Sequence, residues 1–186
     1  LSYSGTGLTK LSQQYHEIIR EHICRGAYKH AKRPILINNW EATYFNFNEE
    51  KILKIAEQAQ KLGIEMLVLD DGWFGKREDD NSGLGDWFVN EKKMNGSMAQ
   101  LAEKIHKMGM KFGLWFEPEM ISEDSDLYRA HPDWAFAIPG RVPNHSRNQL
   151  VLDMTREDVR EYLLERLTTI VHAVSYTHLT LPTNRE

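Results

Sequence analysis

The apolar residues of this chain follow two kinds of pattern, which together predict strands that alternate with helices. The predicted strands are short, nearly continuous apolar runs at residues 35–37, 64–69, 111–116 and 149–152. The predicted helices repeat apolar residues about every 3.6 positions and lie over residues 9–26, 48–63, 97–109 and 155–174. Asn48 and Ser97 are residue types that cap helix N-termini, and they mark where two of these helices begin.

Strand–helix units in series are typical of a parallel sheet with right-handed crossovers. The chain supplies four such units from residue 35 onward, whereas a complete (β/α)8 barrel takes roughly 250 residues. No glycine-rich phosphate loop follows the first strand, as a doubly wound nucleotide-binding sheet would require. The predicted fold class is therefore α/β, an incomplete (β/α)8 TIM barrel of four β/α units, preceded by a helical linker over residues 1–34.

Composition narrows the class of partner. The apolar fraction of 41% and the charged fraction of 27% are ordinary for a globular protein. A formal net charge of −4 and the lack of a basic stripe predict no nucleic-acid partner. No apolar stretch approaches the roughly 20 residues that span a bilayer, so no membrane partner is predicted. The single cysteine, Cys24, excludes an internal disulfide and favours a reducing, cytoplasmic location.

The candidate chemistry is at the predicted strand ends, where α/β folds bind their ligands. Asp70 and Asp71 directly follow the strand at 64–69. Two carboxylates at such an end can accept hydrogen bonds from neighbouring hydroxyls of a polyol, and charged acceptors form the stronger bonds. The alternative is that the pair only caps the turn that follows. A long polar loop over residues 70–96 comes next, and its acidic stretch at 78–80 is interpreted as solvated rather than as a site.

Aromatic and guanidinium groups stand at comparable positions. Trp40, Trp73 and Trp115 could wall a sugar pocket, because an aromatic face packs on the apolar face of a pyranose ring. The alternative is that they are core tryptophans. Arg147 has the forked donors that hold a hydroxyl or a carboxylate in place. Its alternative role is a structural ion pair with an acid such as Asp153 or Glu117.

Two further acids, Glu117 and Glu119, bracket a proline after the third strand. Paired carboxylates are what glycoside cleavage requires, but their spacing in the sequence does not show whether they converge. Oxygen ligands from Asp70, Asp71 and Glu117 could instead hold a divalent cation. The eight histidines include no pair spaced for zinc on a helix. We therefore expect neither a metal nor a cofactor.

Six segments of the chain resemble one family. They are INNWEATYF, VLDDGWFGKR, LGDWFVN, FGLWFEPEM, AHPDWA and SRNQLVLD. In this order they resemble the α-galactosidases of glycoside hydrolase family 36, over roughly residues 8 to 174. The resemblance implies a (β/α)8 catalytic barrel behind an N-terminal β-sandwich domain, and a retaining mechanism without a metal. Residues 1–34 would join the two domains, and residues 35–174 would form the first half of the barrel.

The resemblance also implies roles for individual residues. Trp40, Asp70, Asp71, Trp115 and Arg147 match the residues that bind the terminal galactose. The two aspartates would hold the hydroxyls on C4 and C6, and Glu117 and Glu119 would support the site without being catalysts. No catalytic residue is assigned within this chain, because the family's nucleophile and acid/base aspartates lie beyond the similar region.

Residues 175–186 depart from the family. After the helix that ends near Val174, the family continues into a strand with a Lys-x-Asp motif that carries the nucleophile. Residues 175–186 contain neither Asp nor Lys, and we interpret them as a foreign, artefactual tail. A retaining glycosidase without its nucleophile cannot form its covalent intermediate. The polypeptide as printed is therefore expected to be inactive and, with the apolar faces of half a barrel uncovered, poorly soluble.

The function implied by the resemblance is hydrolysis of terminal non-reducing α-D-galactose residues in oligosaccharides of the melibiose and raffinose type. Bacterial members of the family are often tetramers, so the parent enzyme is expected to be a homotetramer. Three alternatives stay open at this point. They are a galactosyltransferase of the raffinose-synthase type, a non-catalytic sugar-binding remnant, and a metal-dependent barrel enzyme.

Overall fold

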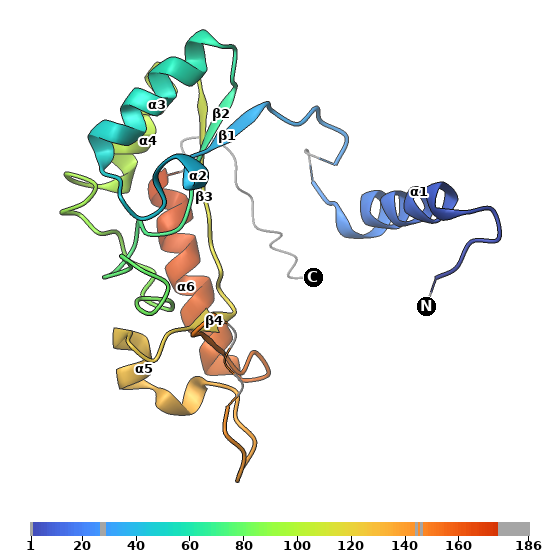
Figure 1. Ribbon diagram of the computed structural model, residues 1–186, viewed down its shortest axis with the longest axis vertical. Coiled ribbons are helices and arrows are strands. Elements are labelled where there is room, and N and C mark those ends of the chain that lie inside the picture. Colours follow the sequence, from blue (N-terminus) through green and yellow to red (C-terminus); the bar gives the residue numbers. More distant parts are fainter. Residues whose placement is uncertain (1, 27–28, 144, 146, 175–186) are drawn as a thin grey trace. The chain divides into compact units, whose positions relative to one another are not determined.

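The computed structural model describes residues 2–26, 29–143, 145 and 147–174, and the chain divides into two units (Figure 1). The unit boundary lies between Arg33 and Pro34. In the N-terminal unit, helix α1 (Leu8–Ile18) continues as a short π-helix, η1 (Ile19–Ile23). The backbone becomes extended at Cys24, so the helix ends earlier than the predicted range of 9–26. Neither helical segment has a buried residue, and the apolar positions of α1 lie at its surface.

The second unit is built around a parallel sheet. Within the described residues this sheet has three strands, β1 (Leu36–Asn38), β2 (Met66–Leu69) and β3 (Lys111–Leu114), in the order β1-β2-β3. Strands that are consecutive in sequence are therefore neighbours in space. Helices α3 (Glu49–Lys61) and α4 (Met98–Lys107) form the two crossovers. The predicted mixed α/β architecture with a parallel sheet is confirmed, and the described part of the sheet is open rather than a closed barrel.

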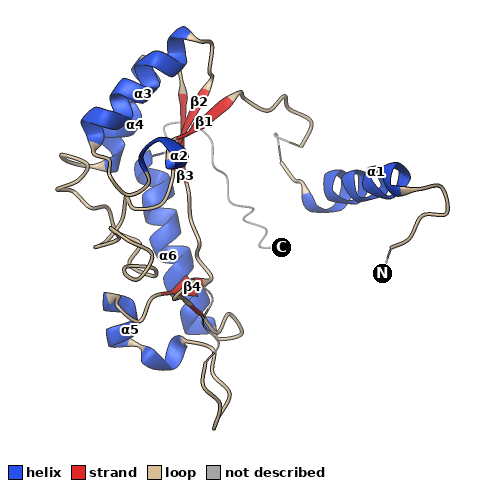
Figure 2. Cartoon of the chain, in the orientation of Figure 1, coloured by secondary structure: helices blue, strands red, loops and turns tan. Residues whose placement is uncertain are grey.

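The predicted fourth parallel strand is wrong. Residues Leu150–Val151 do form a strand, β5, but it pairs antiparallel with β4 (Met120–Ile121) in a separate sheet. The chain leaves β3, passes through a long excursion and folds back on itself, as the loops in Figure 2 show. A hydrogen bond of 2.8 Å from Leu152 N–H to Glu119 O extends this pairing. A short apolar run fits a strand of either direction, because the pattern carries no information about its partner.

Local capping explains where the crossover helices begin. The Asn48 side chain accepts a hydrogen bond from Lys51 N–H at the start of α3. Ser97 and Gln100 form a reciprocal capping box at the start of α4, which satisfies two backbone donors that the helix leaves unpaired. The last helix, α6 (Glu157–Val174), begins after Thr155, whose hydroxyl instead donates to Asp153 at 2.6 Å.

The remaining elements are short. They are α2 (Trp40–Thr43), which follows β1, and α5 (Asp126–Ala130) and the 3-10 helix η2 (Pro132–Trp134), which lie in the excursion after β3. Helix α4 contacts both α3 and α6, so the three long helices form a row along the sheet (Figure 1). This row and the sheet enclose the apolar core.

The side chains of β2 show which face of the sheet the helices cover. Leu67 and Leu69 are fully buried in the core, whereas Met66 and Val68 are only half-buried. A Cβ atom built on Gly113 of β3 would meet Met66 and Val68, so these three residues share the second face. Among the side chains of β2, complete burial is therefore found on one face of the sheet alone.

Candidate functional site

Asp70 lies directly after β2, at the carboxyl end of the parallel sheet. Its backbone N–H donates to Asn39 Oδ1 at 2.8 Å, and its carboxylate accepts hydrogen bonds from Asn38 Nδ2 and from Asp71 N–H. A carboxylate has about four lone-pair sites, so these two bonds leave acceptor capacity for a ligand. The residue is half-buried. Asp70 is therefore an oriented carboxylate that still has access to solvent.

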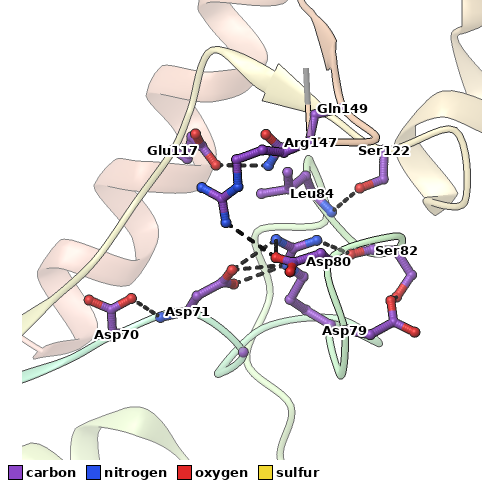
Figure 3. A network of polar contacts seen from close by, with 12 residues as sticks. Asp70, Asp71, Asp79, Asp80, Ser82, Leu84, Glu117, Ser122, Arg147 and Gln149 are labelled. Atoms are coloured by element: carbon purple, nitrogen blue, oxygen red, sulfur yellow. Dashed lines mark hydrogen bonds and ion pairs between the residues drawn. The ribbon is translucent and has the colours of Figure 1, made fainter. Parts of the chain in front are cut away.

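The neighbouring Asp71 has a different environment, because its side chain is buried against Arg77. Asp71 is 3% exposed and Arg77 is fully buried. Arg77 donates from Nη2 to Asp71 Oδ2 at 2.8 Å and from Nε to Asp71 Oδ1 at 3.0 Å (Figure 3). The two adjacent aspartates thus have separate partners. Of the two predicted hydroxyl acceptors, only Asp70 is left accessible by this geometry.

The turn after the aspartates is fixed by a glycine and a lysine. Gly72 has a φ of 97°, and a Cβ atom there would come within 2.9 Å of the Phe45 ring, so another residue would be strained. Lys93 Nζ donates to the Gly72 carbonyl oxygen at 2.9 Å and lies 4.1 Å from the centroid of the Phe47 ring. Burial lowers the pKa of the Lys93 ammonium. The backbone that carries Asp71 is therefore held from two sides.

Arg147 reaches the same region from the excursion after β3. Its Nη2 lies 3.2 Å from Asp80 Oδ1, in the loop after β2 (Figure 3). The predicted structural partners were Asp153 and Glu117, but Asp153 accepts from Thr155 and Glu117 accepts from Gln149 Nε2 at 3.0 Å. Burial raises the pKa of Glu117, although the Arg147 charge opposes that effect. The positive charge of Arg147 therefore favours the ionised form of Glu117, although the two side chains do not form a hydrogen bond.

The three candidate tryptophans have different environments. Trp73 is fully buried, packs against Phe74 and donates from Nε1 to the Trp115 carbonyl at 3.1 Å. Of the two alternatives that the sequence left open for Trp73, the core residue is therefore confirmed. Trp115 and Trp40 are half-buried. Val68 and Gly113 share the face of the sheet away from the helices. Asp70 and Trp115 come two residues after them, and side chains two residues apart on a strand point to the same face, so Asp70 and Trp115 are expected on that face as well.

Sequence reasoning missed Arg77 and Asp80. Both lie in the loop 70–96, whose acidic stretch was interpreted as solvated, yet Asp80 Oδ1 lies within ion-pair distance of both Arg77 and Arg147. The sequence did contain one signal that could have identified this pair: Arg77 is a single arginine next to acidic residues, shortly after the end of a strand. Such an arginine is a candidate partner for a carboxylate at that end.

No group of three or more His, Cys, Asp or Glu side chains is arranged to hold a metal ion in that part of the chain. Among the helices that the structure describes, none is long and apolar enough to cross a membrane.

The fold and the candidate site together define an α/β domain with polar side chains at the carboxyl end of a parallel sheet, and comparison with known proteins gives the family. The melibiase family model matches residues 1–186. The bifunctional α-galactosidase/sucrose kinase AgaSK of Mediterraneibacter gnavus is 58% identical over 171 residues, which are 92% of this chain and 18% of that protein. The chain belongs to the melibiase family, the α-galactosidases of glycoside hydrolase family 36.

A second relative supports the assignment in sequence and structure. The α-galactosidase AgaA of Geobacillus stearothermophilus is 52% identical over 183 residues, which are 98% of this chain and 25% of that protein. Its crystal structure superposes with a TM-score of 0.83 at 54% identity, over 90% of this chain and 23% of that chain. Variants of AgaA have been solved in complex with stachyose and with raffinose. The chain thus spans a quarter or less of the length of these relatives.

Proposed function

We propose that this chain forms part of an enzyme that hydrolyses terminal non-reducing α-D-galactose residues from oligosaccharides of the raffinose type. The observation that carries the proposal is the oriented, accessible carboxylate of Asp70 at the carboxyl end of β2, on the same face as Trp115. The complexes of AgaA with raffinose and stachyose support this substrate class. The order β1-β2-β3, with neighbours consecutive in sequence, supports a (β/α)8 barrel in the whole enzyme.

The proposed site has an acidic, an aromatic and a cationic component. Asp70 accepts hydrogen bonds from the hydroxyls on C4 and C6 of galactose, and Asp71, buried beside it, is paired with Arg77. Trp40 and Trp115 pack against the apolar face of the ring. Arg147 donates hydrogen bonds to the sugar. These residues are proposed to bind the sugar. The whole enzyme is proposed to be a cytoplasmic homotetramer.

The bond-breaking chemistry is assigned to other parts of the enzyme. In a retaining glycosidase, a carboxylate attacks the anomeric carbon while a carboxylic acid protonates the leaving oxygen, and water then hydrolyses the glycosyl-enzyme. Both catalytic aspartates are proposed to lie in parts of the whole enzyme other than residues 35–174. The role proposed for residues 35–174 is therefore to bind and orient the galactose ring, and the printed polypeptide alone is proposed to be inactive.

Substrate choice tests this function directly. We expect the longest natural protein that contains this chain to hydrolyse 4-nitrophenyl α-D-galactoside with a kcat/KM about 1000-fold or more above that for the α-D-glucoside. The reason is that the glucoside presents its C4 hydroxyl in the other orientation and leaves the Asp70 carboxylate without that hydrogen bond. Equal rates for the two substrates, or no release of nitrophenol from either, would contradict the proposal.

A further inference from the structure

Four charged residues connect the end of β2 with the segment that precedes β5. They are Asp71, Arg77, Asp80 and Arg147, which we call the Arg77 network (Figure 3). Arg77 Nη2 lies 2.8 Å from Asp71 Oδ2 and 3.7 Å from Asp80 Oδ1. Arg147 Nη2 lies 3.2 Å from the same Asp80 oxygen. The network therefore joins Asp71, the neighbour of the proposed galactose ligand Asp70, to Arg147, which is far away in the sequence.

The first half of the network is rigid because the guanidinium group of Arg77 has partners on every side. Its Nε and Nη2 bond to Asp71, and its Nη1 donates to the Ser82 carbonyl at 2.9 Å. The group also lies 5.5 Å from the centroid of the Phe45 ring. A planar guanidinium that binds a carboxylate through two nitrogens fixes both its position and its plane. Arg77 thus sets the orientation of the Asp71 carboxylate.

The second half of the network is more exposed and depends on Asp80. The side chains of Asp80 and Arg147 are 50% and 59% exposed. Asp80 lies between two guanidinium groups, and its charge offsets their mutual repulsion. A hydrogen bond of 2.8 Å from Asn148 Nδ2 to Asn81 Oδ1 joins the same two segments. Asp80 and its neighbour therefore keep the segment that carries Arg147 against the loop after β2.

We propose that Arg77 and Asp80 are positioning residues of the galactose site, and that Asp80 holds Arg147 in the orientation in which it binds the sugar. The inference rests on the proposed function. Its physical reason is that a long, half-exposed arginine side chain loses conformational freedom when it binds a ligand. An ion pair that already restricts the side chain lowers that loss, so sugar affinity depends on a residue that need not touch the sugar.

Two neutralising substitutions in the same loop test this role in the longest natural protein that contains the chain. Asp80→Asn is expected to raise the Kd for galactose and the KM for an α-galactoside about fivefold, the size of effect that an exposed ion pair supports, with little change in kcat. Asp79→Asn is the matched control, because Asp79 bonds only to Asn81 and Ser82 among the contacts described for it. The control is expected to leave both constants within about twofold of wild type.

A double-mutant cycle shows whether Asp80 acts through Arg147. In the Arg147→Gln background, Asp80→Asn is expected to change the Kd for galactose by less than about twofold, because the side chain that it positions is gone. The same fivefold loss in both backgrounds, or equal effects of Asp79→Asn and Asp80→Asn, would overturn the inference.

The wild-type protein separates this inference from the function on which it rests. If the wild type hydrolyses α-galactosides and Asp80→Asn matches the control, only the positioning role fails. If the wild type neither binds galactose nor cleaves α-galactosides, the proposed function fails, and the inference fails with it.

Discussion

An Arg77→Met variant is expected to lose about 3–5 kcal/mol of unfolding free energy, because it leaves the Asp71 charge buried without its partner. Asp71 is 3% exposed, and Arg77 supplies its ion pair from a fully buried position. Methionine fills much of the arginine volume, so the loss reports the missing charge rather than a cavity. Chemical denaturation followed by tryptophan fluorescence measures this loss, since Trp73 and Trp87 belong to the same loop as Arg77 and are buried in the core.

Two comparisons make this result specific. Arg141→Met removes an exposed arginine and is expected to change the unfolding free energy by less than about 0.5 kcal/mol. Adding Asp71→Asn to Arg77→Met removes the unpaired charge and is expected to recover part of the loss. An Arg77→Met variant as stable as the wild type would show that Asp71 and Arg77 do not form a buried pair.

The largest effect on activity is expected at Asp70. An Asp70→Asn variant of the longest natural protein that contains this chain is expected to lose about 100-fold in kcat/KM for α-galactosides, because hydrogen bonds to a charged group contribute about 1.5–3 kcal/mol each. Asparagine retains one acceptor oxygen, but it replaces the other with an NH2 group that cannot accept from a hydroxyl. Steady-state kinetics with an α-D-galactoside measures the change.

The control for Asp70 is the same substitution at another strand end. Asp153 follows β5, and its carboxylate accepts hydrogen bonds from the Thr155 backbone and hydroxyl. Asp153→Asn is expected to keep kcat/KM within about threefold of wild type, since Asp153 has no proposed contact with the sugar. Similar losses in the two variants would show that Asp70 acts through folding rather than through the substrate.

The parts of the fold that follow from local signals could be predicted from the sequence. The starts of α3 and α4 depend on Asn48 and Ser97, whose side chains cap backbone donors a few residues away. The order of β1, β2 and β3 follows from short strands joined by helices, because right-handed crossovers leave few other arrangements. In both cases the information is contained within one element or between two consecutive elements.

The parts that depend on distant partners could not be predicted. The direction of β5 is set by its pairing with β4, some thirty residues earlier, and an apolar run does not encode that pairing. Trp73 is a core residue because residues 87 and 116 bring aromatic rings to it from other segments.

The partners of charged groups were equally inaccessible to the sequence. The separate environments of Asp70 and Asp71 depend on Arg77, which folds back onto Asp71 from the following loop. Arg147 meets Asp80, which is 67 residues away, rather than either acid that was predicted as its partner. A strand end therefore indicates where ligand chemistry is found, but the packing of the loops decides which carboxylate stays accessible.

The central claim is that the carboxyl end of β2 binds the terminal galactose. A crystal structure of the longest natural protein that contains this chain, determined with galactose bound, tests this claim most directly. We expect the Asp70 carboxylate within hydrogen-bond distance of the C4 and C6 hydroxyls, with Trp115 against the ring and the Arg147 guanidinium donating to the sugar. Galactose bound at a place that none of these three residues touches would contradict it.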